Sequence, residues 1–240
     1  MNGWHHGMLC AFDTESTDSD PETARIVTAC VSWVDGSGKA KPVTRTWLAD
    51  PGVPSKPEAL RVHGISDERA RKEGASPVVV LAEIAEELLR AAAEGIPVVA
   101  FNAPFDFTIT DRETRRHGLG PFGPLFEAAD GLVVDPYVLD KHLSYRKGKR
   151  TLGLVAEHYG VKAGQAHDAA GDAITAARVA WAIAAKYPKI AEMTLDALFA
   201  YQVLAKREQA KSLAKYFAEI GKPQTVDPWW PLKPWTGEGS

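Results

Sequence analysis

The sequence MLCAFDTE, residues 8–15, starts with an apolar run and ends with two carboxylates, Asp13 and Glu15. A short apolar run of this kind predicts a strand. A longer β-branched run over 25–34 closes at the turn sequence DGSG, residues 35–38, and residues 43–48 resume the alternation of apolar and polar side chains. We therefore expect an antiparallel meander of three strands in the first 50 residues.

Helical and extended patterns alternate after this meander. Apolar residues at a period near 3.6 predict a helix from Ser76 to the stop at Gly95-Ile96-Pro97, and further helices over 105–117, 151–159 and 168–187. Short apolar runs predict strands over 97–101 and 132–134. This order indicates an α/β protein with a mixed five-stranded sheet, in which parallel strands extend the meander and helices flank both faces.

The chain divides into two regions. Residues 1–187 contain the predicted sheet, and residues 188–240 form a C-terminal extension with a helical pattern over 190–220. The tail that follows is rich in proline and contains Trp229, Trp230 and Trp235. Such a helix and tail are expected to dock a partner or pair two copies, or else to pack on their own domain.

Composition limits the class of protein. The 240 residues are 45% hydrophobic and 25% charged, which is enough for one substantial core with an appendage. Residues 1–7 lack a signal-peptide pattern, and no stretch reaches the roughly 20 apolar residues of a membrane span. We expect a soluble, cytoplasmic protein with no membrane partner, whose two cysteines, Cys10 and Cys30, are buried thiols.

A net charge of −3 argues against a protein that holds nucleic acid by broad electrostatic attraction. It does not exclude a nuclease, because a carboxylate cluster presents metal ions to the phosphate. Two basic clusters, over 112–117 and 146–150, are candidates for guiding a phosphate chain, and the simpler interpretation is a solvated helix end and a surface loop.

Four carboxylates come from three distant segments. Asp13 and Glu15 lie two residues apart and so share one face of a strand, while Asp106 follows the predicted strand 97–101 at a helix start. Each of these has an ordinary alternative as a solvated strand end or a helix cap. Asp172 lies on the apolar stripe of the helix 168–187, where a carboxylate is costly unless it is paired or bound to a metal.

Together these carboxylates form an oxygen-rich set that suits Mg²⁺ or Mn²⁺ better than zinc. Two such cations could bind about 4 Å apart, and a nearby imidazole, that of His167, could accept the proton of a bound water because the unperturbed pKa of histidine is about 6.5. The His167-Asp168 doublet also matches metal phosphohydrolases in part. That scheme needs further histidine ligands, and the other histidines show no supporting spacing.

Three segments carry a resemblance to a known family: FDTES at 12–16, FNAPFD at 101–106 and HDAAGDA at 167–173. In this order they resemble the three motifs of the DEDDh, or DnaQ-like, 3′-to-5′ exonucleases, which include the proofreading epsilon subunit of bacterial DNA polymerase III. A fourth segment, VHGISD at 62–67, resembles the family stretch that lines the terminal-nucleotide site. The similarity spans about residues 7–187, and a histidine at position 167 favours the DEDDh branch over its tyrosine-containing relatives.

The resemblance implies a ribonuclease H-like fold and assigns roles to named residues. The implied metal ligands, for two Mg²⁺ or Mn²⁺ ions, are Asp13, Glu15, Asp106 and Asp172, and the implied general base is His167. The implied substrate contacts are Thr14, Ser16, Val62, His63, Asn102 and Phe105. The sequence departs from the family pattern after the first motif, where Ser16-Thr17-Asp18 stands in place of a second threonine and a glycine.

The function implied is hydrolysis of nucleic acid from a 3′ end to nucleoside 5′-monophosphates, with single-stranded DNA favoured over RNA. An RNA-trimming enzyme of the same family is one alternative. A module that keeps the fold and binds a polymerase or a second copy through residues 188–240 is another. Service in proofreading, in DNA repair or in the degradation of short oligonucleotides stays open.

Overall fold

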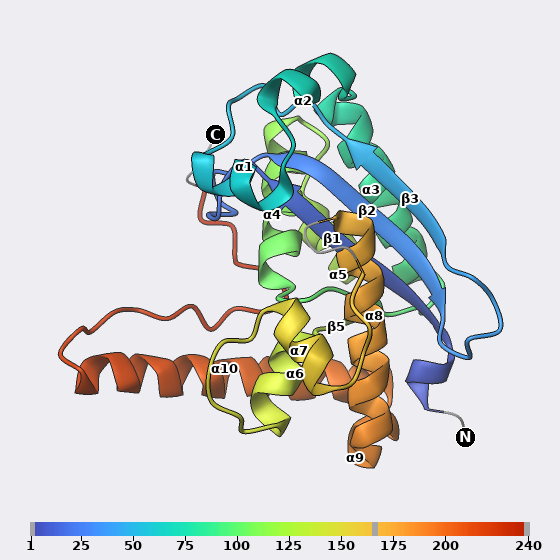
Figure 1. Cartoon of the computed structure of the whole chain (residues 1–240), viewed down its shortest axis with the longest axis vertical. Helices are drawn as coiled ribbons and strands as arrows, with labels where there is room; N and C mark the ends of the chain where they lie inside the picture. The colour runs from blue at the N-terminus through green and yellow to red at the C-terminus, as the bar shows by residue number, and fades with distance from the viewer. Residues whose placement is uncertain (1–2, 165–167, 238–240) are drawn as a thin grey trace.

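A computed structural model describes residues 3–164 and 168–237 of the chain. Its centre is one mixed sheet of five strands in the order β3-β2-β1-β4-β5 (Figure 1). The strands are β1 (Met8–Ser16), β2 (Ile26–Asp35), β3 (Val43–Leu48), β4 (Val98–Val99) and β5 (Val133–Val134). The first three pair antiparallel, and β4 and β5 extend β1 in parallel. The predicted α/β fold and mixed sheet are confirmed.

Two layers of helices cover the sheet. One layer contains α3 (Pro77–Ala93), α4 (Pro104–Arg116) and α5 (Phe122–Ala128). The other contains α6 (Pro136–Leu143), α7 (Leu152–His158) and α8 (Ala169–Lys186). Each layer has its own apolar core, because successive side chains of a strand point to opposite faces. Cys10 and Cys30 are buried free thiols, as predicted.

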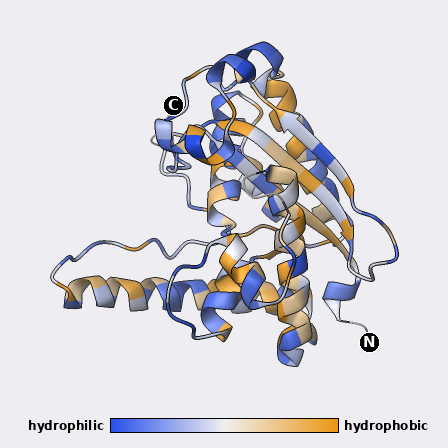
Figure 2. Cartoon of the chain, viewed as in Figure 1, coloured by the Kyte–Doolittle hydropathy of each residue, from blue (hydrophilic) through white to orange (hydrophobic). Residues whose placement is uncertain are grey.

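Strand β1 shows this alternation most clearly. Cys10 and Phe12 pack into the core beneath α3, α4 and α5, whereas Leu9 and Ala11 pack into the core beneath α8. Figure 2 shows that the longer hydrophobic stretches lie along the central strands and that the outlying helix α2 (Asp67–Glu73) is largely hydrophilic. The same alternation determines the face of the sheet toward which each side chain of residues 13–16 points.

Several elements were not predicted from the sequence. They are η1 (Trp4–His6), α1 (Pro57–His63), α2, α5 and α6. Helix α1 begins with proline at its first turn and ends at Gly64, whose φ of 70° is left-handed. These are ordinary start and stop signals for a helix. Pro57, the last proline of the stretch 51–57, thus starts a helix.

The C-terminal extension is arranged differently from the single helix predicted over 190–220. It has a short helix, α9 (Pro188–Ala191), and a long helix, α10 (Leu195–Glu219), separated by a break at which Thr194 caps α10 through Ala197 N–H. A capping threonine favours a helix start over continuation, which explains the break. One end of α10 lies against α6 and β5 and its other end projects from the body, and residues 221–237 return to α4 (Figure 1).

Candidate active site

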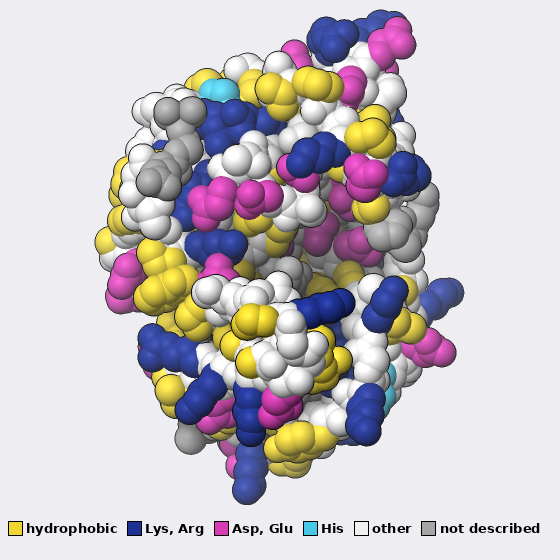
Figure 3. Space-filling model, turned by 90° about the vertical axis from the view of Figure 1, so that its left-hand side faces the viewer, with side chains coloured by type: hydrophobic (Ala, Val, Ile, Leu, Met, Phe, Trp, Pro, Cys, Tyr) yellow, Lys and Arg dark blue, Asp and Glu magenta, His cyan; other side chains and the backbone are white. Residues whose placement is uncertain are grey.

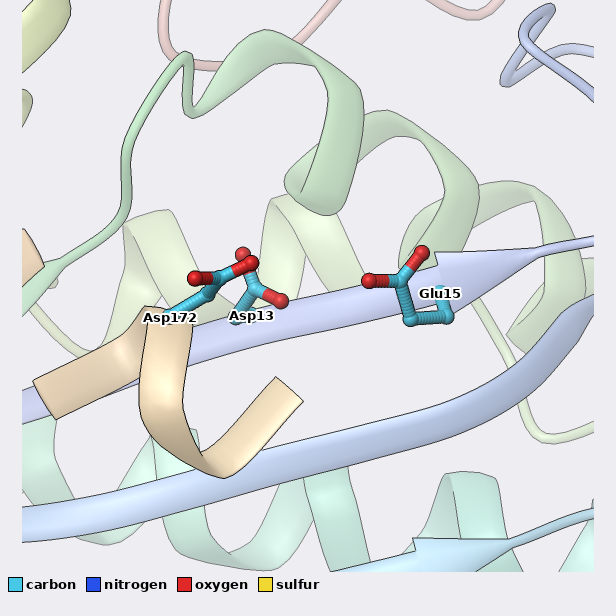
Figure 4. A group of neighbouring side chains, drawn as sticks. All are labelled: Asp13, Glu15 and Asp172. Atoms are coloured by element: carbon cyan, nitrogen blue, oxygen red, sulfur yellow. The ribbon is translucent and has the colours of Figure 1, made fainter. Parts of the chain in front are cut away.

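Strand β1 places two carboxylates beside α8. Because Leu9 and Ala11 face α8, the alternation of the strand sends Asp13 and Glu15 toward the same helix. Asp172, in the first turn of α8, meets them there (Figure 4). One carboxylate oxygen from each of the three lies within 4.8 Å of the other two. All three side chains are half-buried, so they remain open to a ligand from solvent.

The fourth carboxylate approaches from the opposite side of β1. Asp106, 3% exposed, lies in the first turn of α4. Its Oδ1 accepts hydrogen bonds from Thr14 N at 3.0 Å and from Thr14 Oγ1 at 2.7 Å. Thr14 faces α4 because it alternates with Asp13 and Glu15 on the strand. Asp106 is outside the tight group of three, but its charge acts on Asp13.

Burial and mutual repulsion shift the acidities of these carboxyls. The pKa of Asp13 is raised well above its ordinary value by burial, then by the charges of Asp106, Glu15 and Asp172. Burial, with Asp172 and Asp168, raises the pKa of Glu15 to about 7. Burial also raises the pKa of Asp106 to about 7, against the opposing hydrogen bonds from Thr14. Without a cation, the cluster resists full ionisation.

The donor set fits a hard divalent cation. Asp13, Glu15 and Asp172 offer carboxylate oxygens only, and Mg²⁺ and Mn²⁺ prefer such ligands, whereas zinc prefers nitrogen and sulfur. A bound cation would also relieve the repulsion that raises these pKa values. The face in Figure 3 is hollowed near its middle, and acidic side chains lie inside the hollow. The predicted base, His167, lies outside the described residues.

A pocket of about 450 Å³ adjoins the carboxylates. Five of the six predicted substrate contacts line it: Thr14, Ser16, Val62, His63 and Phe105. Phe105 is partly buried and packs on the core while also lining the pocket, so it has both a structural contact and a surface open to a ligand. Val62 is 46% exposed and presents an apolar side chain to a ligand.

His63 is fixed in one tautomer by the backbone. Its Nδ1 accepts a hydrogen bond from Ile65 N at 3.0 Å, and burial lowers the pKa of the ring, so the neutral imidazole carries its proton on Nε2. The side chain is 9% exposed, and Nε2 has no hydrogen-bond partner among the described residues. A buried N–H of this kind is a ready donor for a ligand in the pocket.

The sixth predicted contact, Asn102, is not among the residues that line this pocket. Its φ is 66°, in the left-handed region that asparagine tolerates better than most residues. Its N–H donates to Asp135 Oδ1 at 2.9 Å, and its carbonyl accepts from Phe105 N. In the structure Asn102 therefore shapes the turn that starts α4.

Ser16, where the first motif departs from the family pattern, is 8% exposed. Its hydroxyl donates to the carbonyl of Asp18 at 2.7 Å. The smaller side chain at this position thus holds the loop after β1, and the hydroxyl still lines the pocket.

Lys56 was not singled out from the sequence, and it is the only lysine or arginine among the described residues that line the pocket. It pairs with Asp18, which also lines the pocket. Lys56 is also the N-cap residue of α1, which carries Val62 and His63. Recognition of α1 from its first-turn proline would have pointed to this cation.

The two basic clusters are largely engaged within the protein. Arg112 is 1% exposed and bonds Glu22, Asp111 and the carbonyls of Lys233 and Pro234. It is therefore neither a solvated helix end nor a free phosphate ligand.

In the second cluster, Arg146 and Arg150 both pair with the buried Asp140, at 3.1 and 2.9 Å. Lys147 and Lys149 stay exposed, so they are the members of this loop that remain open to a phosphate.

Comparison with known proteins defines the class. The model of the RNase T family, described as exonuclease, matches residues 10–180, and the chain belongs to this exonuclease family. The match spans β1, α4 and the start of α8, which carry the four carboxylates. The predicted DnaQ-like 3′-to-5′ exonuclease domain and the predicted class of enzyme are confirmed.

The solved structures most similar in fold include those of Exonuclease I. E. coli Exonuclease I in complex with a dT13 oligonucleotide superposes with a TM-score of 0.64 at 18% identity, covering 87% of this chain and 46% of that one. Its complex with a dA16 oligonucleotide gives 0.66 at 17% identity, with 87% and 45% covered. The moderately thermophilic Exonuclease I from Methylocaldum szegediense gives 0.62 at 21% identity, with 88% and 46% covered.

These likenesses establish the fold, and the chain spans less than half the length of each Exonuclease I structure. The comparison with curated proteins finds no match to the sequence. Among the described residues, no helix is long and apolar enough to cross a membrane. Binding of a polymerase or a second copy through residues 188–240 stays a prediction.

Proposed function

We propose that this protein is a divalent-metal-dependent exonuclease that removes nucleoside 5′-monophosphates from the 3′ end of single-stranded DNA. The observation that carries the proposal is the convergence of Asp13, Glu15 and Asp172 to within 4.8 Å beside a nucleotide-sized pocket. Three carboxylates this close repel one another, and a bound divalent cation offsets that repulsion. The exonuclease family match over the same residues supports this assignment.

The side chains have distinct roles in the proposed reaction. Asp13, Glu15, Asp106 and Asp172 would hold two Mg²⁺ or Mn²⁺ ions, which supply an activated water and charge stabilisation for an in-line displacement at phosphorus. His167 accepts the proton of the attacking water, since an imidazole with an ordinary pKa is a competent base near neutrality. Thr14 orients Asp106 through two hydrogen bonds to Oδ1.

The pocket is suited to the terminal nucleotide. Phe105 and Val62 offer apolar surface to a sugar or base, and His63 offers the Nε2 proton as a hydrogen-bond donor. Lys56 places one positive charge in the lining of the pocket, and Asp18 balances it, so side-chain cations provide little net attraction for phosphate there. Most of the attraction for the scissile phosphate would come from the cations themselves.

DNA is favoured over RNA because Exonuclease I, which shares the fold, has been crystallised with dT13 and dA16 oligonucleotides. An RNA-trimming enzyme would have to accommodate a 2′-hydroxyl in the same pocket. The pocket is large enough that its volume alone does not exclude RNA.

The test is a panel of single-stranded DNA and RNA oligonucleotides labelled at the 5′ end, incubated with Mg²⁺, with Mn²⁺ or with EDTA. We expect a ladder of products shortened from the 3′ end, faster on DNA and abolished by EDTA. The His167→Ala protein is expected to turn over about 10²-fold more slowly, the usual loss on removing a general base. Metal-independent cleavage, or no product from either substrate, would refute the proposal.

A further inference from the structure

Asp135 is a fully buried carboxylate outside the proposed metal cluster. It directly follows β5 and is 0% exposed. A buried carboxylate is stable only when its oxygens accept enough hydrogen bonds. Asp135 accepts five, all from N–H groups, so both oxygens act purely as acceptors.

These five donors connect three parts of the chain. Oδ1 accepts from Tyr137 N at 2.9 Å and Val138 N at 3.4 Å, which caps the start of α6. The turn after β4 donates twice, from Asn102 N at 2.9 Å to Oδ1 and from Ala103 N at 3.0 Å to Oδ2. The fifth donor is a side chain from the C-terminal tail.

The turn that Asp135 holds leads directly into a proposed metal ligand. Ala103 is the N-cap residue of α4, and its side chain makes no capping hydrogen bond. Asp106 lies three residues later, in the first turn of the helix, and reaches β1 through Thr14. The position of Asp106 is thus fixed at both ends, by Thr14 at its carboxylate and by Asp135 before its helix.

The C-terminal extension holds Asp135 in turn. Trp230, 7% exposed, donates from its indole Nε1 to Asp135 Oδ2 at 3.0 Å and packs its ring against Phe199 of α10, with centroids 5.0 Å apart. Gln202 of α10, 0% exposed, accepts from Asp135 N at 2.7 Å and donates to Val133 O at 2.9 Å. The backbone and the side chain of Asp135 are therefore both tied to the extension.

We infer that Trp230, acting through Asp135, is a positioning residue for the metal ligand Asp106, so that the C-terminal tail tunes metal binding and turnover in the domain it covers. The inference rests on the proposed function, because it needs Asp106 to hold a cation. Partners behind a metal ligand orient it, and their loss typically weakens metal binding or activity by about 10- to 100-fold. Trp230 acts one step further away, so a smaller loss is expected.

The test compares Trp230→Phe with Trp229→Phe in the full-length protein. The first change keeps an aromatic ring and removes the indole N–H, whereas Trp229 is 49% exposed and its indole makes no hydrogen bond among the described residues. We expect Trp230→Phe to bind Mn²⁺ about 3- to 10-fold more weakly in calorimetry and to lower kcat by a similar factor. KM for the oligonucleotide should stay unchanged, because the substrate pocket is intact.

A second measurement follows the hydrogen bonds themselves. Amide hydrogen exchange at Asn102 and Ala103 should speed up in Trp230→Phe and stay unchanged in Trp229→Phe, as expected when one acceptor of those amides is loosened. If Trp230→Phe does not fold, Asp135→Asn serves, since it keeps the size of the side chain and turns one acceptor into a donor. We expect that variant to weaken Mn²⁺ binding by about 10-fold or more.

The outcomes separate this inference from the proposed function. Equal Mn²⁺ affinity and equal exchange in the wild type and Trp230→Phe would overturn the inference and leave the exonuclease proposal standing. A wild-type protein that binds no Mn²⁺ would overturn both. Weaker Mn²⁺ binding together with an equally raised KM would also count against positioning, since it would indicate general disruption of the site.

Discussion

Helix α4 carries buried charged residues in its first turn and in its second half, and within the described part of the chain only those in the second half are paired with opposite charges. At its start, Asp106 joins carboxylates that repel one another, and burial raises its pKa to about 7. Within the described residues, no lysine or arginine forms an ion pair with Asp13 or Glu15 beside it. In the second half of the helix, Asp111, Arg112 and Glu113 are each at most 1% exposed and are paired with opposite charges.

The second group is complete without a ligand. Arg112 Nη1 contacts Asp111 Oδ2 at 2.6 Å, and Arg115 Nε contacts the same oxygen at 2.8 Å. Asp111 Oδ1 accepts from Gly123 N, and Trp235 of the tail lies over the guanidinium groups of Arg112 and Arg115. Burial of charge is therefore not itself a sign of function. The carboxylates near the start of α4 lack a basic partner among the described residues, and a bound cation would supply the opposite charge.

The largest effect is expected on turnover, from a substitution that removes one carboxylate of the acid cluster. Asp13→Asn removes a proposed ligand and one repelling charge, so exonuclease turnover in Mg²⁺ should fall by roughly 10³ or more, while the metal-free protein stays at least as stable. Turnover and the thermal unfolding midpoint in EDTA measure the two effects. Asp130→Asn, an exposed position between α5 and β5 whose charge does not act on the acid cluster, is the control and should stay active. An active Asp13→Asn enzyme would contradict the ligand assignment.

The second prediction concerns the paired group of Asp111, Arg112 and Glu113, where a substitution should lower stability and not activity. Arg112→Met leaves Asp111 and Glu22 without their shared partner, and removing one member of a buried pair costs about 3–5 kcal/mol of unfolding free energy. Activity per folded molecule should be preserved. Urea denaturation gives the free energy, and Arg69→Met, which breaks an exposed pair with Glu73 at the cost of under about 1 kcal/mol, is the matched control. Equal losses in both variants would remove the distinction.

The sequence predicted the acid cluster better than the paired group for a physical reason. The alternation of β1 is local, so residues 13 and 15 could be assigned to one face before any tertiary contact was known. Apart from the adjacent Asp111, the partners of Arg112 are Glu22 and the carbonyls of residues 233 and 234, which are 90 to 122 positions away. No periodic pattern encodes such contacts, and the arginines at 112–116 were read as a helix end.

The same contrast holds for the fold. Long amphipathic elements such as α3 and α8 were placed correctly within one or two residues, because their apolar faces span several turns. The short helices α1 and α6 were missed although both begin with proline, since seven or eight residues give too little periodicity. The Asp135 contacts were also invisible in the sequence, because they join a strand end to Trp230, 95 positions away.

The smallest effect, a pH dependence, sharpens the comparison. Glu15 in the metal-free folded protein keeps its proton up to about pH 7, whereas the unfolded chain releases it near the ordinary value of 4.5. Between these values the folded state binds more protons, so the free energy of unfolding falls as pH rises. Mg²⁺ competes with those protons, so its stabilising effect should grow over the same interval.

Thermal unfolding in EDTA and in Mg²⁺ at a series of pH values from about 5 to about 8 measures both trends. Glu15→Gln cannot titrate at this position, so it should make the decline in EDTA shallower and leave the part that comes from Asp13 and Asp106, whereas Glu68→Gln on the exposed surface of α2 should leave the whole decline unchanged. A Mg²⁺ shift that is constant across the series would mean that the cation binds away from Glu15. The acid cluster would then not be the cation site, and the contrast between the two groups of α4 would fail.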